Sequence, residues 1–128
     1  MVNHKTILVI DDDPTVLHLL QKKLTQACGY KVLTALDGVS GLELACRCRP
    51  DLILLDVMMP EKSGGEVADA LSQREETRDI PVIVISVLLD TAGKKRIEIN
   101  ERQYRAVSKP IYLPELLAQI RKALNEAN

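Results

Sequence analysis

The sequence predicts an α/β domain in which short buried strands alternate with amphipathic helices around one parallel sheet. Three runs are continuously apolar, as strands buried on both faces of a parallel sheet are, and they cover residues 7–10, 52–55 and 82–85. A weaker run covers residues 31–35, and a more polar one at 104–107 suits the edge of the sheet. Because strand and helix alternate five times, we expect a doubly wound (βα)5 domain with right-handed crossovers.

Apolar stripes at helical spacing predict the segments between the strands. The expected helices cover residues 14–27, 39–48, 65–74, 91–100 and 113–127. Gly29 is placed to end the first helix, Pro50 ends the second, and Pro114 suits the first turn of the last. The stripe is weakest in residues 91–100.

Size and composition suit one globular domain. A chain of 128 residues provides for a single core, and we expect the domain to fill residues 1–128 with its core at about 5–126. The net charge of −1 argues against direct binding to nucleic acid, and the apolar runs are too short to cross a membrane. Three cysteines without a secretory leader predict reduced thiols in a cytoplasmic protein.

Polar side chains follow four of the predicted strands, at the point where each strand ends. They are Asp11 to Asp13, Asp56, Ser86 and Lys109. Each residue taken alone is commonly a turn residue or a helix cap, and Asp12 or Asp13 is placed to cap the helix that begins at Pro14. Because the carboxyl ends of parallel strands share one edge of a sheet, we expect these side chains to meet there.

Carboxylates gathered in one crevice repel each other unless a cation lies among them. Oxygen ligands of this kind suit Mg²⁺, which bridges carboxylates to phosphate oxygens. The hydroxyl of Ser86 and the ammonium group of Lys109 add donors for an anion on the other side of the metal. The pattern therefore predicts a site for phosphoryl transfer, in which positioning and charge neutralisation provide most of the catalysis.

The sequence resembles the receiver domain of two-component response regulators along nearly its whole length. The matching segments are residues 7–14, 35–38, 50–60, 80–86 and 109–110, and the Asp-Val-Met-Met-Pro ending of the third is the most specific. The resemblance implies a flavodoxin-like sheet with strand order 2-1-3-4-5. It also implies a signalling domain that assists its own phosphorylation and dephosphorylation, and no turnover enzyme.

By the same resemblance, Asp56 is the phosphoacceptor. Asp11 and Asp12, together with Asp56, are similar to the residues that hold Mg²⁺ (or Mn²⁺), with Asp12 the direct ligand of the acidic pair. Met58 occupies the position whose backbone carbonyl completes the metal site. We therefore expect Mg²⁺ to bind before phosphorylation.

The resemblance also assigns the contacts of the phosphoryl group and the partners. The phosphoryl group is expected to come from a sensor histidine kinase or a phosphotransfer protein. After the transfer it is expected to be bound by Ser86, the backbone of Val87 and Lys109. Movement of Ser86 is then expected to switch the face made by the fourth helix, fifth strand and fifth helix, where an unknown output partner binds. A homodimer is compatible with this scheme.

The sequence departs from the family pattern near that face. The aromatic position three residues before Lys109 holds Ala106, and Tyr104 lies two residues earlier on the same side of the strand. Val87 replaces the small residue usual after Ser86. Residues 94–104 lack the usual Gly-Ala turn, which predicts an irregular fourth helix.

Two other functions are compatible with parts of the sequence. Residues 11–15 satisfy Asp-x-Asp-x-Thr, a motif similar to that of haloacid-dehalogenase-type phosphatases, with Asp11 as nucleophile and Asp13 as acid/base. That family also needs an acidic pair after its lysine, and only Glu115 and Glu126 follow Lys109, both in the last helix. A receiver-like module that binds partners without phosphorylation is the second alternative.

Overall fold

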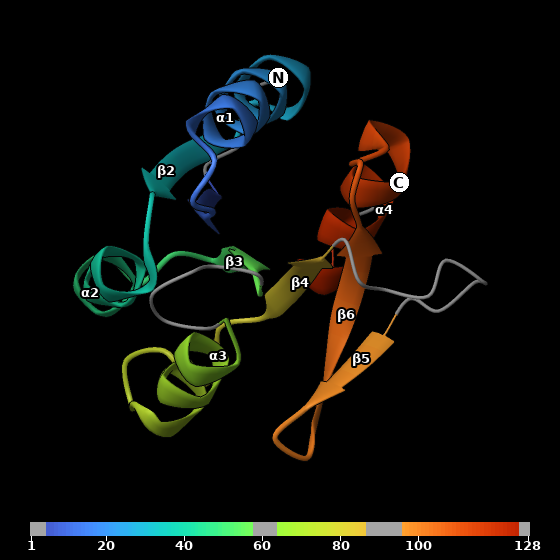
Figure 1. The fold of residues 1–128 in the computed structure, drawn as a ribbon. Helices are drawn as coiled ribbons and strands as arrows, with labels where there is room; N and C mark the ends of the chain where they lie inside the picture. The colour runs from blue at the N-terminus through green and yellow to red at the C-terminus, as the bar shows by residue number, and fades with distance from the viewer. Residues whose placement is uncertain (1–4, 58–63, 87–95, 126–128) are drawn as a thin grey trace.

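The protein folds around one six-stranded sheet with helices on both faces (Figure 1). The structure is a computed structural model and describes residues 5–57, 64–86 and 96–125. The sheet order is β2-β1-β3-β4-β6-β5. The elements are β1 (Thr6–Ile10), α1 (Pro14–Cys28), β2 (Lys31–Ala35), α2 (Gly38–Cys48), β3 (Leu52–Asp56), α3 (Gly64–Gln73), β4 (Val82–Ser86), β5 (Arg96–Ile99), β6 (Arg102–Ser108) and α4 (Leu113–Ala123).

Five of the strands are parallel and confirm the predicted winding. β1 pairs with β2 on one side and β3 on the other, β3 pairs with β4, and β4 pairs with β6. With β6 as the fifth strand, this is the order 2-1-3-4-5. The carboxyl ends of these strands therefore lie along one edge of the sheet, where the polar residues of the sequence were expected to meet.

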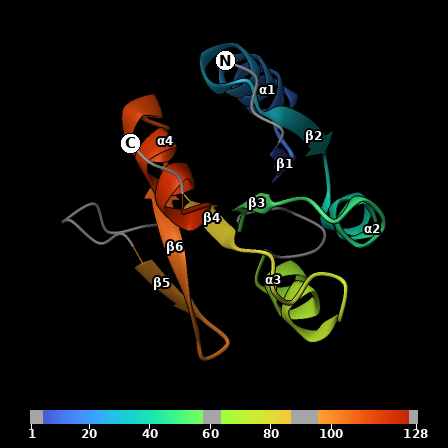
Figure 2. The same ribbon diagram turned by 180° about the vertical axis from the view of Figure 1, so that it is seen from behind.

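Two apolar layers hold the helices against the sheet. Alternate residues of β1 point to opposite faces, so that Ile7 and Val9 belong to one layer and Leu8 and Ile10 to the other. The first layer receives the buried stripes of α1 and α4, and the second receives those of α2 and α3. Figure 2 shows the same two helix pairs from behind.

Helix ends follow the signals that the sequence carries. The Asp13 side chain accepts a hydrogen bond from Thr15 N and caps α1, and Gly29 ends that helix in the left-handed region at φ 72°. Asp37 caps α2 by accepting from Ser40 N, which lowers the pKa of the Asp37 carboxyl. The last helix ends at Ala123, four residues before the predicted end.

The predicted helix over residues 91–100 is wrong in the part that the structure describes. Arg96–Ile99 form β5, an antiparallel partner of β6, and residues 87–95 lie outside the described part. Polar and apolar residues alternate in β5, and its exposure alternates with them. The sequence had predicted an edge strand at residues 104–107. That prediction is wrong, because β5 takes the edge and β6 lies between β4 and β5.

Among the described residues, no helix has both the length and the apolar character needed to cross a lipid bilayer.

Candidate functional site

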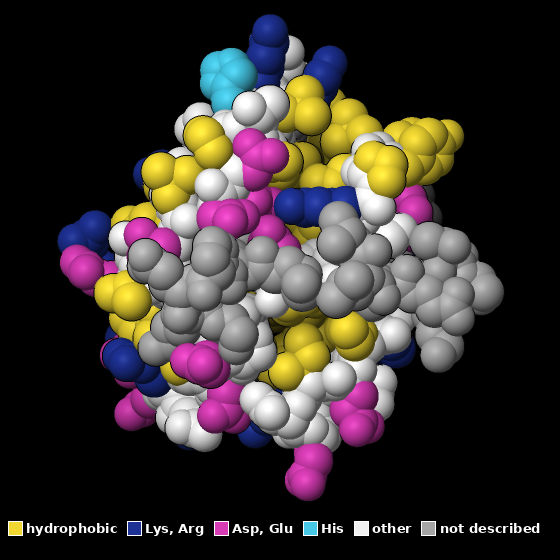
Figure 3. Space-filling view, in the orientation of Figure 1, with side chains coloured by type: hydrophobic (Ala, Val, Ile, Leu, Met, Phe, Trp, Pro, Cys, Tyr) yellow, Lys and Arg dark blue, Asp and Glu magenta, His cyan; other side chains and the backbone are white. Residues whose placement is uncertain are grey.

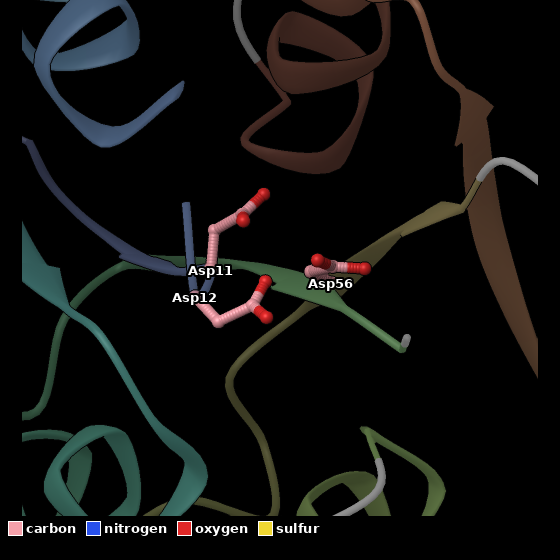
Figure 4. Close-up of side chains that lie close together, drawn as sticks. All are labelled: Asp11, Asp12 and Asp56. Atoms are coloured by element: carbon pink, nitrogen blue, oxygen red, sulfur yellow. The ribbon is translucent and has the colours of Figure 1, made fainter. Parts of the chain in front are cut away.

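Three carboxylates meet at the carboxyl edge of the sheet. One oxygen from each of Asp11, Asp12 and Asp56 lies within 4.8 Å of the others. In Figure 4, Asp11 and Asp12 reach the site from the end of β1, and Asp56 reaches it from the end of β3. The structure therefore brings together three residues that the sequence had assigned to one site.

The backbone fixes two of these carboxylates in buried positions. Asp56 is the last residue of the central strand β3, and its neighbour Val57 donates from its backbone N to Ile85 O at 3.2 Å. Asp11 follows β1, and its backbone N donates to Ala35 O at 3.1 Å, which extends the pairing of β1 with β2. Asp11 is 1% exposed and Asp56 3%, so that water compensates little of their charge.

The three consecutive aspartates have three different environments. The Asp11 carboxylate accepts a hydrogen bond from Asp13 N at 2.9 Å, which fixes the turn after β1. Asp12 is exposed to solvent but still faces the other two carboxylates. Asp13 turns away to cap α1, which confirms the expectation that one residue of this group serves the helix.

Lys109 provides the positive charge of the site. Its Nζ lies 2.8 Å from Asp11 Oδ2 and 3.3 Å from Asp56 Oδ2, and its backbone N donates to Ser86 O at 3.1 Å. Burial lowers the pKa of Lys109, but the hydrogen bonds and charges of Asp11 and Asp56 outweigh that effect and raise the pKa above its ordinary value. The ammonium group therefore stays charged between the two buried carboxylates.

The surface view shows this arrangement from outside. In Figure 3, acidic side chains gather near the middle of the face, directly beside a basic side chain. Negative and positive charge therefore meet on this face of the molecule.

The other residues predicted for the site lie in β4 and β6 or outside the described residues. Ser86 is the last residue of β4 and is 2% exposed, and it lies in register with Ser108, the residue before Lys109. Ala106 is buried in β6. Tyr104 is half-buried in the same strand, and burial raises the pKa of its phenol. Met58 and Val87 lie outside the described residues, so their predicted contacts stay predictions.

The donor set fits a hard divalent cation. All three clustered groups are carboxylates, and oxygen ligands are those that Mg²⁺ prefers. One lysine offsets only part of the charge of three carboxylates, which leaves a net negative site. An added cation would neutralise that excess and reduce the repulsion among the aspartates.

Two features of the site were not predicted. From the sequence, Lys109 was expected to bind an anion. The direct ion pair of Lys109 with Asp11 was missed because residues 98 positions apart show no pairing signal. The close approach of Gly64 was missed too: a Cβ there would lie 2.2 Å from the Cα of Val57. A glycine at the start of a helix that follows the Asp56 strand was the available signal.

The geometry does not favour the phosphatase alternative. That mechanism requires Asp11 and Asp13 to face the same substrate, but the Asp13 carboxylate bonds Thr15 N at the start of α1. The residue that shares the site with Asp11 is Asp56, which the phosphatase motif leaves without a role.

Comparison with known proteins agrees with this geometry. The family model described as response regulator receiver domain matches residues 7–121. The Brucella anthropi polar-differentiation response regulator DivK is 33% identical over 96% of this chain and 98% of its own length. The Synechocystis DNA-binding dual master transcriptional regulator RpaA is 37% identical over 95% of this chain, which spans only 50% of RpaA.

Solved structures share the architecture. A putative response regulator from Chloroflexus aurantiacus superposes with a TM-score of 0.82 at 26% identity, over 97% of this chain and 100% of its own. The Francisella response regulator 1452 receiver domain gives a TM-score of 0.80 at 28% identity, over 95% of this chain and 98% of its own. With its sheet order and its cluster of carboxylates at the strand ends, this chain belongs to the response regulator receiver domain family.

Proposed function

We propose that this receiver domain accepts a phosphoryl group on the Asp56 carboxylate, from a sensor histidine kinase or a phosphotransfer protein. The observation that carries the proposal is the position of Asp56. It ends the central strand, is 3% exposed, and has the Lys109 ammonium group 3.3 Å from its Oδ2. A nucleophilic carboxylate beside a fixed cation is the arrangement that phosphoryl transfer requires.

In the transfer, one carboxylate oxygen of Asp56 forms a bond to phosphorus while the bond from phosphorus to the histidine nitrogen of the donor breaks. The product is an acyl phosphate, and the donor imidazole keeps the electron pair of the broken bond. Lys109 lies close enough to offset the charge that moves onto the phosphoryl oxygens. Ser86 and the backbone of Val87 are proposed to bind those oxygens in the product.

Mg²⁺ (or Mn²⁺) is the proposed cofactor, held by Asp11, Asp12, Asp56 and the backbone carbonyl of Met58. When bound, it supplies positive charge that neutralises phosphoryl oxygens and carboxylates together. The chain itself places the ligands. The Asp11 carboxylate accepts hydrogen bonds from Lys109 Nζ and Asp13 N, whereas Asp12 is exposed to solvent.

The phosphorylated state is proposed to alter the surface around β6. Lys109 follows β6 directly, and its backbone N is bonded to Ser86 O. A movement of Ser86 toward the phosphoryl group therefore pulls on the junction of β4 and β6. Ala106 provides no large side chain to swing inward, so the packing of the half-buried Tyr104 is the proposed readout. Residues 1–128 are proposed to act as one unit in this response.

Intact-mass measurement after incubation with acetyl phosphate and Mg²⁺ tests the proposal. We expect one phosphoryl adduct on the parent protein, removed by hydroxylamine, and none on Asp56→Asn. Asp13→Asn is the matched control, because asparagine also caps a helix well and the substitution stays outside the carboxylate cluster.

Other outcomes separate the alternatives. Steady hydrolysis of acetyl phosphate that is lost in Asp11→Asn but kept in Asp56→Asn would contradict the proposal and support the phosphatase. A parent protein that gives neither adduct nor turnover, with Mg²⁺ bound, would leave a binding module that works without phosphorylation.

A further inference from the structure

The edge strand β5 provides a surface that the phosphoryl-transfer site does not use. It is the outermost strand of the sheet in both ribbon views, and it pairs on one side only, with β6 (Figures 1 and 2). Among the described residues no strand lies beyond it. An exposed strand edge presents main-chain donors and acceptors that can pair with another strand.

The hydrogen-bonding pattern of β6 determines which backbone groups of β5 point to the open edge. The backbone N of Lys109, directly after β6, donates to Ser86 O of β4. Backbone groups of a strand point alternately to its two neighbours. The backbone N–H and C=O groups of the odd-numbered residues of β6 therefore point to β4, and those of the even-numbered residues point to β5.

Ile97 and Ile99 lie opposite even-numbered residues of β6, so their backbone groups point inward to that strand. The two-residue turn agrees with this phase, because Asn100 and Glu101 both have positive φ, at 50° and 68°, as type I′ hairpins require. The N–H and C=O groups of the exposed Arg96 and Glu98 therefore point to the open edge.

We propose that β5 pairs antiparallel with β5 of a second copy of this chain, centred on Ile97, to form a continuous sheet across a two-fold axis. Arg96 of each copy then lies opposite Glu98 of the other. Both residues have outward backbone groups, so each of the two Arg96–Glu98 pairs exchanges two main-chain hydrogen bonds. Ile97 meets Ile97 of the second copy in the close, non-hydrogen-bonded position between them.

Charge selects this register over its neighbours. A centre on Arg96 or on Glu98 also joins outward backbone groups, but it places two arginines or two glutamates directly opposite each other, which is unfavourable. Only the centre on Ile97 gives two unlike pairs within the strand Arg96–Ile99. The strand is therefore self-complementary in hydrogen bonding and in charge.

The surroundings of Arg96 also favour a carboxylate partner. Across the hairpin, Arg96 lies opposite Arg105. Both line a surface hollow whose charged residues are Arg78, Asp79, Arg96, Arg105 and Lys122, an excess of positive charge. Glu98 of the same copy accepts a hydrogen bond from Gln103 Nε2 at 3.1 Å, two residues further along the hairpin. Glu98 of a second copy would add negative charge at the open side of Arg96 and offset part of this excess.

The interface is short, so a weak dimer that forms with increasing concentration is expected. Sedimentation equilibrium of the full chain, unphosphorylated and at low ionic strength, measures it from micromolar to millimolar concentration. Arg96→Glu and Glu98→Arg each create two like-charge pairs and should each weaken the dimer about tenfold. Because the protein is unphosphorylated, the result does not depend on the function proposed for Asp56.

Two ways of combining these substitutions test the register itself. An equimolar mixture of Arg96→Glu and Glu98→Arg places unlike charges at both pairs, and should regain parental affinity as a heterodimer. The double variant Arg96→Glu/Glu98→Arg should regain it alone. Glu75→Arg changes the net charge as Glu98→Arg does, at an exposed position outside the edge, and should leave the dimer unchanged.

Circular dichroism should confirm that every variant keeps the parental fold, as expected for exposed positions. A parent that stays monomeric at all concentrations would overturn the proposal. A dimer unaffected by Arg96→Glu would assign the contact to another surface, and a mixture without recovery would reject the register centred on Ile97. Each of these three results would contradict the inference.

Discussion

The Nζ atom of Lys109 lies 2.8 Å from Oδ2 of Asp11, although 98 residues separate the two in the chain. The contact joins the end of β1 to the end of β6, across the strands β3 and β4 that lie between them in the sheet. Because Asp11 is buried and the Lys109 side chain is 18% exposed, the pair is well shielded from water.

Replacement of Lys109 by methionine should lower the free energy of unfolding by about 2 kcal/mol at pH 7 without Mg²⁺, because two buried carboxylates lose their counter-charge. Urea unfolding at pH 7 measures the difference. Lys122→Met, at an exposed position in α4, is the control and should be neutral. Equal stability of Lys109→Met and parent at pH 7 would contradict the prediction.

Stability should also fall in alkaline solution. The pKa of Lys109 in the folded protein is raised above the ordinary 10.5, so the stabilisation by its charge is complete below that pH and is lost as the pH rises through the higher folded value. Tyr104, whose pKa burial raises from 10.0, acts in the same direction. Unfolding curves of Tyr104→Phe isolate the lysine contribution, which should persist in that variant and disappear in Lys109→Met.

Asp12→Asn should separate charge repulsion from metal binding. Without Mg²⁺ the variant should be more stable than the parent by about 0.5–1 kcal/mol, because one of three clustered carboxylates loses its charge. Saturating Mg²⁺ should stabilise the parent strongly and the variant little, since binding to the folded state adds to stability. Thermal unfolding with and without Mg²⁺ measures both effects.

Asp13→Asn is the neighbouring control for that experiment. Its side chain caps α1 outside the cluster, so its gain from Mg²⁺ should match that of the parent. If Asp12→Asn gained as much from Mg²⁺ as Asp13→Asn, Asp12 would not be a ligand.

Gly64→Ala should be strongly destabilising, by about 2 kcal/mol or more. The added Cβ would meet backbone atoms, 2.2 Å from the Cα of Val57 and 2.8 Å from the carbonyl oxygen of Asp56, and backbone cannot rotate away. In Gly41→Ala the nearest atom is Cδ1 of Ile10 at 2.5 Å, which belongs to a side chain that can repack. In urea unfolding, Gly64→Ala should therefore have a lower free energy of unfolding than Gly41→Ala. The reverse order would contradict this prediction.

The parallel part of the sheet and the carboxylate cluster could be predicted because strong local signals specify both. The apolar runs of β1, β3 and β4 are buried along nearly their whole length, and the residues that follow them reach the same edge by the geometry of a parallel sheet. Placing Asp11, Asp12 and Asp56 together also required the strand order, which came from the resemblance to the receiver family. What the sequence could not show was which aspartate faces Lys109 and which caps the helix, because these depend on side-chain directions within one turn.

The antiparallel hairpin could not be predicted with the signals used. Its turn is Asn100-Glu101, and the glutamate at φ 68° lacks the glycine that marks most two-residue hairpins. Ile97 and Ile99 alternate with charged residues, but four residues are too few to distinguish a strand from the end of a helix. The expectation of a helix over residues 91–100 was based on a weak apolar stripe at helical spacing, and the strand-like alternation of residues 96–99 prevailed.

The exchange of a helix for β5 changes what this side of the molecule offers to its surroundings. A helix satisfies its own backbone and is recognised only through side chains, whereas an edge strand displays backbone groups that are the same for every amino acid. Substitutions along β5 would then be tolerated wherever an extended conformation is kept, and discrimination between partners would depend on Arg96 and Glu98 alone. Selectivity for a binding partner would thus depend on two residues, whereas on a helical face it depends on many side chains.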